Sequence, residues 1–147
     1  MGSEQTFHIT VAYQDGPDAH VTKVYAIDTK TFRKLHRTKD WLGRARDQPT
    51  GEALAVWLRK KGCKLDSPDG PAFVQRYACG NRVEEYYRNG EKHRDDGPAV
   101  VVHKTDGRRY ETYYVRGNLQ KYLVRSPNGT AIPLSLSGPP HPRYPSP

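Results

Sequence analysis

Four consecutive residues, His93, Arg94, Asp95 and Asp96, bring together an imidazole, a guanidinium and two carboxylates. An imidazole beside carboxylates can exchange protons with a substrate, so His93, Asp95 and Asp96 could perform general acid–base chemistry. Alternatively, these groups make hydrogen bonds and ion pairs within the protein. No nucleophile stands at a recognisable spacing from them. We therefore expect no catalytic residues, and a cryptic enzyme ranks third among the functions considered.

These residues lie inside an internal repeat with a 27-residue period. The matched positions include Asp69, Gly70, Pro71, Ala72, Val74, Gly80, Glu84, Tyr86, Tyr87 and Gly90, which return as Asp96, Gly97, Pro98, Ala99, Val101, Gly107, Glu111, Tyr113, Tyr114 and Gly117. Ten matches in one register indicate a repeated structural unit. A fainter third start, 126–132, resembles 67–73 but comes five residues late.

Each unit has the pattern of a β-hairpin followed by a connector. Residues 72–77 and 82–88 are rich in strand-forming types, and Asn89-Gly90 is typical of a tight turn. The Asp-Gly-Pro-Ala segment precedes the first strand, where we expect glycine to take an unusual backbone angle. Asp69 and Asp96 are then expected to hydrogen-bond within their own turns. His93 and its neighbours thus lie at the joint between two hairpins.

The stretch 89–101, NGEKHRDDGPAVV, resembles the His-Arg-x-Asp-Gly-Pro-Ala repeats, a MORN-like variant found in proteins of bacteria, bacteriophages and large viruses. The resemblance covers 67–121. It implies a β-hairpin meander and no defined reaction, and it suggests an accessory or inhibitory protein of bacterial, phage or viral origin.

Strand alternation assigns the hairpin residues to two faces. We expect Val83, Glu85 and Tyr87 to lie on the buried face, with their repeat counterparts Tyr110, Thr112 and Tyr114. The opposite face carries Glu84, Tyr86 and Arg88, with the counterparts Glu111, Tyr113 and Val115. We predict a non-enzymatic binding module that contacts a protein partner through Tyr86, Arg88, Tyr113, His93 and Arg94.

Residues 1–62 have the pattern of a β-β-α-α unit. Residues 6–13 and 19–28 alternate apolar and polar types around a Gly-Pro turn. An amphipathic helix is predicted over 30–46, and a second helix ends with basic residues before Gly62. The fold class is therefore α+β: an N-terminal hairpin and two helices packed against an antiparallel hairpin-repeat sheet over 63–124. Residues 125–147 form a degenerate repeat start and a proline-rich tail.

The charge favours an anionic partner as the second hypothesis. The 147 residues contain 24 Lys and Arg against 16 Asp and Glu, a net charge of +8. Seven basic residues between Lys30 and Arg46 are accompanied by a single acid, Asp40. Nucleic-acid binding would use the helix over 30–46 and the end of the next helix. The candidate residues are Arg33, Lys34, Arg37, Arg44, Lys60 and Lys61.

The remaining signals indicate neither a metal nor a cofactor. Cys63 and Cys79 are sixteen residues apart, without the close spacing of a zinc site or a disulfide framework. No apolar run has the length of a signal peptide or a membrane span, so we expect a cytoplasmic protein with no membrane contact.

Overall fold

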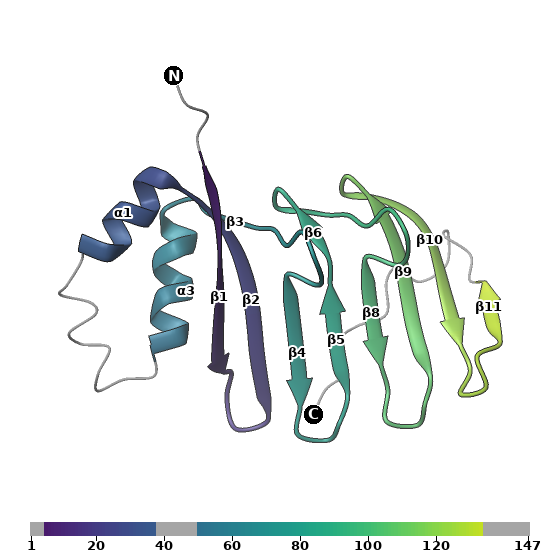
Figure 1. Ribbon diagram of the computed structural model, residues 1–147. Coiled ribbons are helices and arrows are strands. Elements are labelled where there is room, and N and C mark those ends of the chain that lie inside the picture. The colour runs from purple at the N-terminus through teal and green to yellow at the C-terminus, as the bar shows by residue number, and fades with distance from the viewer. Residues whose placement is uncertain (1–4, 38–49, 134–147) are drawn as a thin grey trace.

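A computed structural model describes residues 5–37 and 50–133 as two helices and a mostly antiparallel sheet (Figure 1). The elements are β1 (Thr6–Gln14), β2 (Ala19–Asp28), α1 (Thr29–Arg37), α3 (Thr50–Lys60), β3 (Lys64–Leu65), β4 (Phe73–Tyr77), β5 (Arg82–Glu85), β6 (Tyr87–Arg88), β7 (Glu91–Lys92), β8 (Val100–His103), β9 (Arg109–Val115), β10 (Asn118–Arg125) and β11 (Ala131–Pro133). The main sheet has the order β1-β2-β4-β5-β8-β9-β10-β11, with β3 also paired to β2. The short β6–β7 pair forms a separate sheet. The α+β class is thus confirmed.

The N-terminal hairpin follows the alternation in the sequence closely. β1 and β2 pair antiparallel from Thr6 opposite Asp28 to Gln14 opposite His20. Gly16 has a φ of 75° in the connecting turn, a backbone conformation that favours glycine. The two predicted strands are confirmed because both the alternation and the turn are local signals.

Local signals mark the start of α1 and the end of α3. The Asp28 carboxylate accepts the Thr31 backbone N–H at 2.7 Å and so caps the start of α1. α1 confirms the first part of the helix predicted over 30–46, whereas 38–46 lie outside the described residues. α3 ends as predicted, since Gly62 has a φ of 83° and the Cys63 N–H reaches the Leu58 carbonyl at 3.0 Å.

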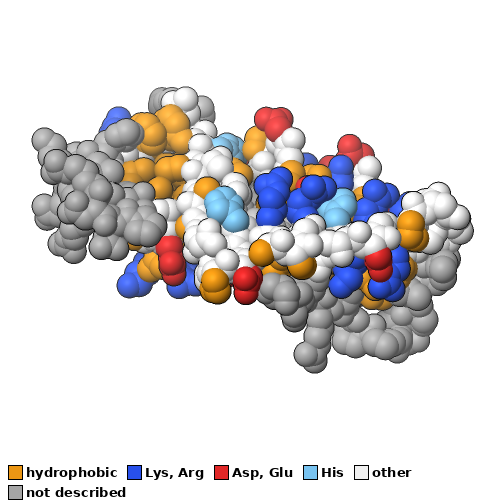
Figure 2. All heavy atoms as spheres, turned by 90° about the horizontal axis from the view of Figure 1, so that it is seen from below, with side chains coloured by type: hydrophobic (Ala, Val, Ile, Leu, Met, Phe, Trp, Pro, Cys, Tyr) orange, Lys and Arg blue, Asp and Glu red, His pale blue; other side chains and the backbone are white. Residues whose placement is uncertain are grey.

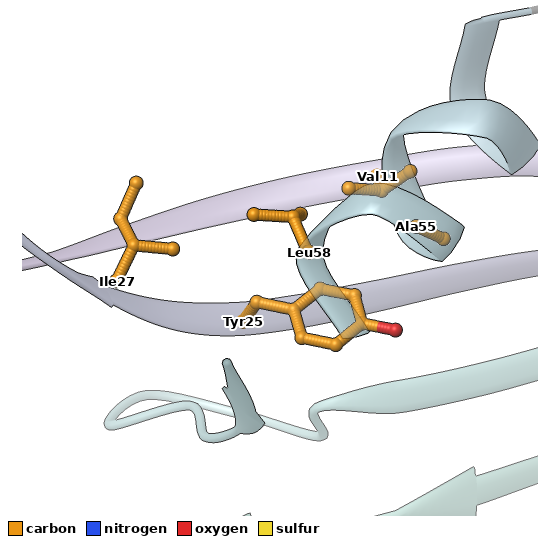
Figure 3. Packing of buried hydrophobic residues seen from close by; sticks show 5 residues of the cluster. All are labelled: Val11, Tyr25, Ile27, Ala55 and Leu58. Atoms are coloured by element: carbon orange, nitrogen blue, oxygen red, sulfur yellow. The ribbon is translucent and has the colours of Figure 1, made fainter. Parts of the chain in front are cut away.

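The helices cover the N-terminal hairpin rather than the whole sheet. In Figure 3, Ala55 and Leu58 of α3 lie over Val11 of β1 and over Tyr25 and Ile27 of β2. These five residues form one core cluster, and Phe32 and Trp57 are among the side chains packed against it. The expectation that the helices pack on the hairpin-repeat strands was wrong. β1 and β2 offer the helices a largely apolar face, and the helices bury their own apolar side chains against it.

A second core cluster lies within the strands that follow β2. Its buried members are Val83, Ala99, Val100, Val102 and Tyr114, with Phe73, Tyr77 and Tyr110 packed against it. The predicted buried face is therefore correct at Val83, Glu85, Thr112 and Tyr114. Large aromatic side chains from neighbouring strands enclose the valines, and this sheet region has an apolar core of its own.

Backbone hydrogen bonds recur in this region with the same 27-residue period as the sequence. The Ala72 N–H donates to the Glu85 carbonyl and the Ala99 N–H to the Thr112 carbonyl, both at 2.9 Å. Two further pairs have the same spacing and matching lengths: Ser67 to Tyr87 with Arg94 to Tyr114, and Gly90 to Leu65 with Gly117 to Lys92. The backbone thus follows corresponding paths at these positions.

Two details of the turn prediction were wrong. Neither Gly70 nor Gly97 has a positive φ. The glycines with positive φ in the two repeat units lie in the tight turns, at Gly80, Gly90, Gly107 and Gly117. In addition, the segment predicted as a third repeat start is a hairpin turn between β10 and β11. The Ser126 N–H bonds to the Thr130 carbonyl just as Tyr77 bonds to Asn81 and Lys104 to Arg108. The shared Gly and Asp or Asn residues of different turn types explain the false match.

Candidate binding site

A cleft of about 370 Å³ opens between the two Asp-Gly-Pro-Ala segments and the chain around β6. Its lining residues are Ser67, Pro68, Asp69, Gly70, Tyr86, Tyr87, Arg88, His93, Arg94, Asp95 and Asp96. Four of the five predicted partner-binding residues, namely Tyr86, Arg88, His93 and Arg94, therefore line one cleft. The fifth, Tyr113, does not line it.

The tight turn between β6 and β7 positions the cleft residues. Asn89 and Gly90 have φ values of 53° and 82°, as an Asn-Gly hairpin turn requires. Tyr87 pairs with Lys92 and Arg88 pairs with Glu91 across this turn. Arg88 is thereby brought close to His93, although the two residues are five positions apart in the chain.

His93 is only 7% exposed, and both of its ring nitrogens have partners. Nδ1 accepts the Arg116 backbone N–H at 2.9 Å, so the ring proton must lie on Nε2. Nε2 then donates to Asp95 Oδ1 at 2.9 Å. Because Arg88 Nη1 lies 3.3 Å from Asp95 Oδ2, the aspartate joins the buried imidazole to an exposed guanidinium.

The Asp95 carboxylate is held in its charged form by these neighbours. Partial desolvation raises the pKa of Asp95, but the interactions with His93 and Arg88 lower it by more, so the pKa lies below its usual value. Asp95 is therefore ionised at neutral pH and keeps the hydrogen-bond acceptor that His93 needs.

The Arg94 guanidinium stacks on the ring of Tyr86. Its guanidinium carbon lies 4.0 Å from the centre of the Tyr86 ring, within the range of a cation–π interaction. The guanidinium also donates to Asp96 Oδ1 and to the Pro98 carbonyl, each at 3.2 Å. Asp96 thus pairs with Arg94, and within the described ranges it makes no hydrogen bond to its own turn, contrary to the prediction.

The repeat counterpart of this stack lies one full period further along the chain. Lys121 Nζ lies 4.5 Å from the centre of the Tyr113 ring. This contact corresponds to that of the Arg94 guanidinium with the Tyr86 ring. The Tyr113 hydroxyl donates to Glu111 Oε1 at 3.1 Å. Both tyrosines, which we expected to be open binding surfaces, therefore have a ring face covered by a cation of their own chain.

A buried carboxylate, Glu85, lies next to the cleft residue Tyr86 in the chain. Burial raises the pKa of Glu85, although the hydrogen bond from Tyr87 and the charge of Lys92 oppose part of this rise. The Tyr87 hydroxyl donates to Glu85 Oε1 at 2.6 Å, while Oε2 has no hydrogen-bond partner among the described residues. Burial and the adjacent carboxylate also raise the pKa of Tyr87.

The residues proposed for nucleic-acid binding lie on the helices, apart from the cleft. Arg33 and Lys34 are exposed on α1, and Lys60 and Lys61 are exposed at the end of α3. Lys61 Nζ lies 5.5 Å from the centre of the Trp57 ring. The Arg37 side chain and all of Arg44 lie outside the part of the chain that the structure describes.

Sequence reasoning missed Ser67 and Asp69 as lining residues. The signal was present, because the 27-residue period makes Asp69 the counterpart of Asp96 and both segments precede strands that flank β5. Glu111 was also misplaced: it was assigned to the exposed face but is 3% exposed. Arg109 and Arg125 pair with its two oxygens at 2.7 and 2.9 Å and cover it.

Comparisons with family models, with curated proteins and with solved structures found no match. Within residues 5–37 and 50–133, no group of three or more His, Cys, Asp or Glu side chains could hold a metal ion. In the same described ranges, no helix is long and apolar enough to cross a membrane.

Proposed function

We propose that the protein is a non-enzymatic binding module that recognises a protein partner through the cleft between 67–70 and 93–96. The observation that carries this proposal is the mixed charge at the rim of the cleft. The side chains of Arg88, Asp95 and Asp96 are 64%, 68% and 87% exposed, around the half-buried Tyr86 and Tyr87. Aromatic residues surrounded by exposed charges of both signs are typical of protein interfaces.

The sign of the charges favours a protein over a nucleic acid at this cleft. Three aspartates, Asp69, Asp95 and Asp96, line it together with only two arginines. A phosphate chain would be repelled by these carboxylates, whereas a protein can offer both a basic and an acidic side chain.

The hydrogen bonds of His93 argue against an acid–base role. A general base needs a free lone pair in reach of the substrate, but Nδ1 is occupied by the Arg116 N–H and Nε2 carries the proton shared with Asp95. His93 then serves to hold two hairpins together, and the cleft residues around it act in binding.

The recurring bonds support a β-hairpin meander of 27-residue units, in which the cleft forms where one unit joins the next. The covered tyrosines Tyr86 and Tyr113 belong to equivalent positions of that repeat. The resemblance to His-Arg-x-Asp-Gly-Pro-Ala repeats supports the same architecture. It also supports an accessory or inhibitory role for a protein of bacterial, phage or viral origin.

Site-specific crosslinking tests the proposal. A photo-crosslinking amino acid replaces Asp96 at the cleft or, as a control, Asp106 in the turn before β9. In cells of the native source, we expect the first position alone to give an adduct with one defined protein. The purified partner should then bind the Asp96→Lys and Arg88→Glu variants at least about tenfold more weakly than the wild type, and bind Asp106→Lys unchanged. Equal adducts from both positions, or unchanged affinity of the cleft variants, would refute the role of the cleft.

A further inference from the structure

Basic side chains form a row across six neighbouring strands on the sheet face away from the helices. The register places the following residues directly opposite one another in succession: His20, Arg76, Arg82, His103, Arg109 and Arg125. Residues opposite each other in a sheet share a face. Tyr25 and Ile27 of β2 face the helices, and His20 is an odd number of positions from both. This row, the arginine row, therefore lies on the other side of the sheet.

Every member of the arginine row is at least partly exposed. Neighbouring strands lie about 4.8 Å apart, so six strands give the row a length of roughly 24 Å. The side chains of Arg82, Arg109 and Arg125 are 38%, 44% and 29% exposed, and Arg76 is exposed. Figure 2 looks at the hairpin-turn end of the sheet and shows a band of His and Lys or Arg side chains across the molecule.

Two glutamates form ion pairs with members of the row and so fix the positions of those side chains. Glu84 lies 3.3 Å from Arg82 and 3.1 Å from His103, while Glu111 pairs with Arg109 and Arg125. Each glutamate thus spans two adjacent members of the row. The four arginines and two glutamates together carry a net charge of +2. Among the described residues, Arg76 forms no ion pair.

The chemistry of the row suits a chain of phosphates. All four permanent cations are arginines, whose planar guanidinium groups bind phosphate through paired hydrogen bonds. The two imidazoles supply further donors between them. A single strand is flexible and can follow a line of cations across a sheet face. A duplex is a cylinder, and its phosphates curve away from such a face.

We propose that the arginine row binds the phosphate backbone of single-stranded nucleic acid, at a surface separate from the cleft. The strand runs across the β-strands from β2 to β10, and its phosphates contact the guanidinium groups of Arg76, Arg82, Arg109 and Arg125. Glu84 holds Arg82 in place, and Glu111 holds Arg109 and Arg125. This site differs from the basic helices, and it does not depend on the protein-binding role of the cleft.

Fluorescence anisotropy with a labelled 20-nucleotide oligo-dT tests the proposal on the full chain. The double variant Arg76→Gln/Arg82→Gln leaves both cations of Glu111 intact. At low salt, we expect it to bind at least about tenfold more weakly than the wild type. The slope of log affinity against log salt should become shallower by about 1.4, which is 0.7 for each phosphate that the variant no longer neutralises.

A matched control removes the same charge from the helices. Arg33→Gln/Lys60→Gln should bind oligo-dT within about twofold of the wild type. A 20-base-pair duplex should bind more weakly than the single strand, and poly-glutamate of equal charge should displace the oligonucleotide poorly. If the double row variant unfolds, Arg76→Gln alone should still weaken binding about threefold, because that substitution breaks none of the ion pairs that fix the row.

Four results would overturn the proposal: no binding of oligo-dT at low salt, equal losses in the row and helix variants, tighter binding of the duplex, or equal displacement by poly-glutamate. The last result would identify an acidic protein as the ligand of the row. Loss of the cleft crosslink at Asp96 would leave the proposal intact, since the two surfaces share no residue.

Discussion

Asp66 and His93 stand one repeat period apart and accept equivalent hydrogen bonds. Asp66 Oδ1 accepts the Asn89 backbone N–H at 2.8 Å, and His93 Nδ1 accepts the Arg116 backbone N–H at 2.9 Å. The two donors are separated by the same period, and they are the two non-glycine residues with positive φ in the described chain. Each acceptor therefore holds a strained turn in the following hairpin.

This equivalence predicts that His93 contributes stability through Nδ1. His93→Ala leaves the Arg116 N–H without its acceptor, so we expect the free energy of unfolding to fall by about 1–3 kcal/mol. His93→Asn keeps an acceptor near the position of Nδ1 and should recover most of the loss. Urea denaturation gives the free energy of unfolding of the wild type and of both variants. Equal stability of the alanine and asparagine variants would contradict the assignment.

Gly97 should be required for the space it leaves to Arg94, and not for its backbone angle. A Cβ atom at Gly97 would lie 3.1 to 3.2 Å from three guanidinium atoms of Arg94, whereas one at Gly70 would meet open space. We expect Gly97→Ala to lower the free energy of unfolding by about 1 kcal/mol. Gly70→Ala should be neutral or slightly stabilising.

A double-mutant cycle isolates the cause of that loss. In the Arg94→Ala background the guanidinium is gone, so Gly97→Ala should no longer destabilise the protein. Thermal or urea unfolding of the four proteins gives the coupling energy. An unchanged cost of Gly97→Ala in this background would show that the crowding lies elsewhere.

Among the glycines that the structure describes, Gly51 should tolerate alanine least. In an exposed helix, Gly→Ala usually stabilises by about 1 kcal/mol. Here, a Cβ would lie 1.9 Å from the Ala12 carbonyl oxygen, which belongs to the β1 backbone and cannot turn aside. We expect Gly51→Ala to cost at least about 2 kcal/mol by displacing α3, as measured by urea unfolding. A stabilised variant would mean that α3 does not approach β1 this closely.

Glu85 should make the protein less stable as the pH rises. Burial raises its pKa in the folded state, so the folded protein binds the proton more tightly than the unfolded chain does. The stabilisation is complete below the unfolded pKa of about 4.3 and is lost as the pH rises through the higher folded pKa.

The Glu85→Gln variant removes this titration and keeps an oxygen for the Tyr87 hydroxyl. The free energy of unfolding of the variant minus that of the wild type should therefore increase as the pH rises from 4 to 7. Urea unfolding across this range measures the difference at each pH. If the variant-minus-wild-type difference stays constant, or falls as the pH rises, the effect of burial on Glu85 is contradicted.

The parts of the fold that depend on near neighbours could be predicted from the sequence. The first hairpin, the end of α3 at Gly62 and the Asn89-Gly90 turn all follow from local residue types. One predicted strand, 82–88, divides into β5 and β6 around Tyr86. The Tyr86 N–H bonds to the Ala99 carbonyl and its carbonyl accepts the His93 N–H, and these partners lie too far away for a strand pattern to reveal.

The candidate sites divide in the same way. Four cleft residues were identified because strand alternation placed Tyr86 and Arg88 on one face and because His93-Arg94 begins an unusual cluster of titratable residues. The arginine row was missed because its members come from different strands, and only the register places Arg76 beside Arg82 and Arg109 beside Arg125. The position of the helices was missed because the choice between two apolar sheet regions is a tertiary one.

The bonds from Asp66 to Asn89 and from His93 to Arg116 both run forward along the chain. Position 120, the next in this series, is a glutamine whose amide donates to the Asn118 carbonyl instead. The series is therefore directional, and each hairpin depends on the one before it to hold its turn. In the proposed meander of 27-residue units, such nearest-neighbour coupling would make the number of units adjustable. A duplicated 27-residue block beginning at His93 would carry both the acceptor, His93, and the donor, Arg116, so we expect each added block to hold its own turn.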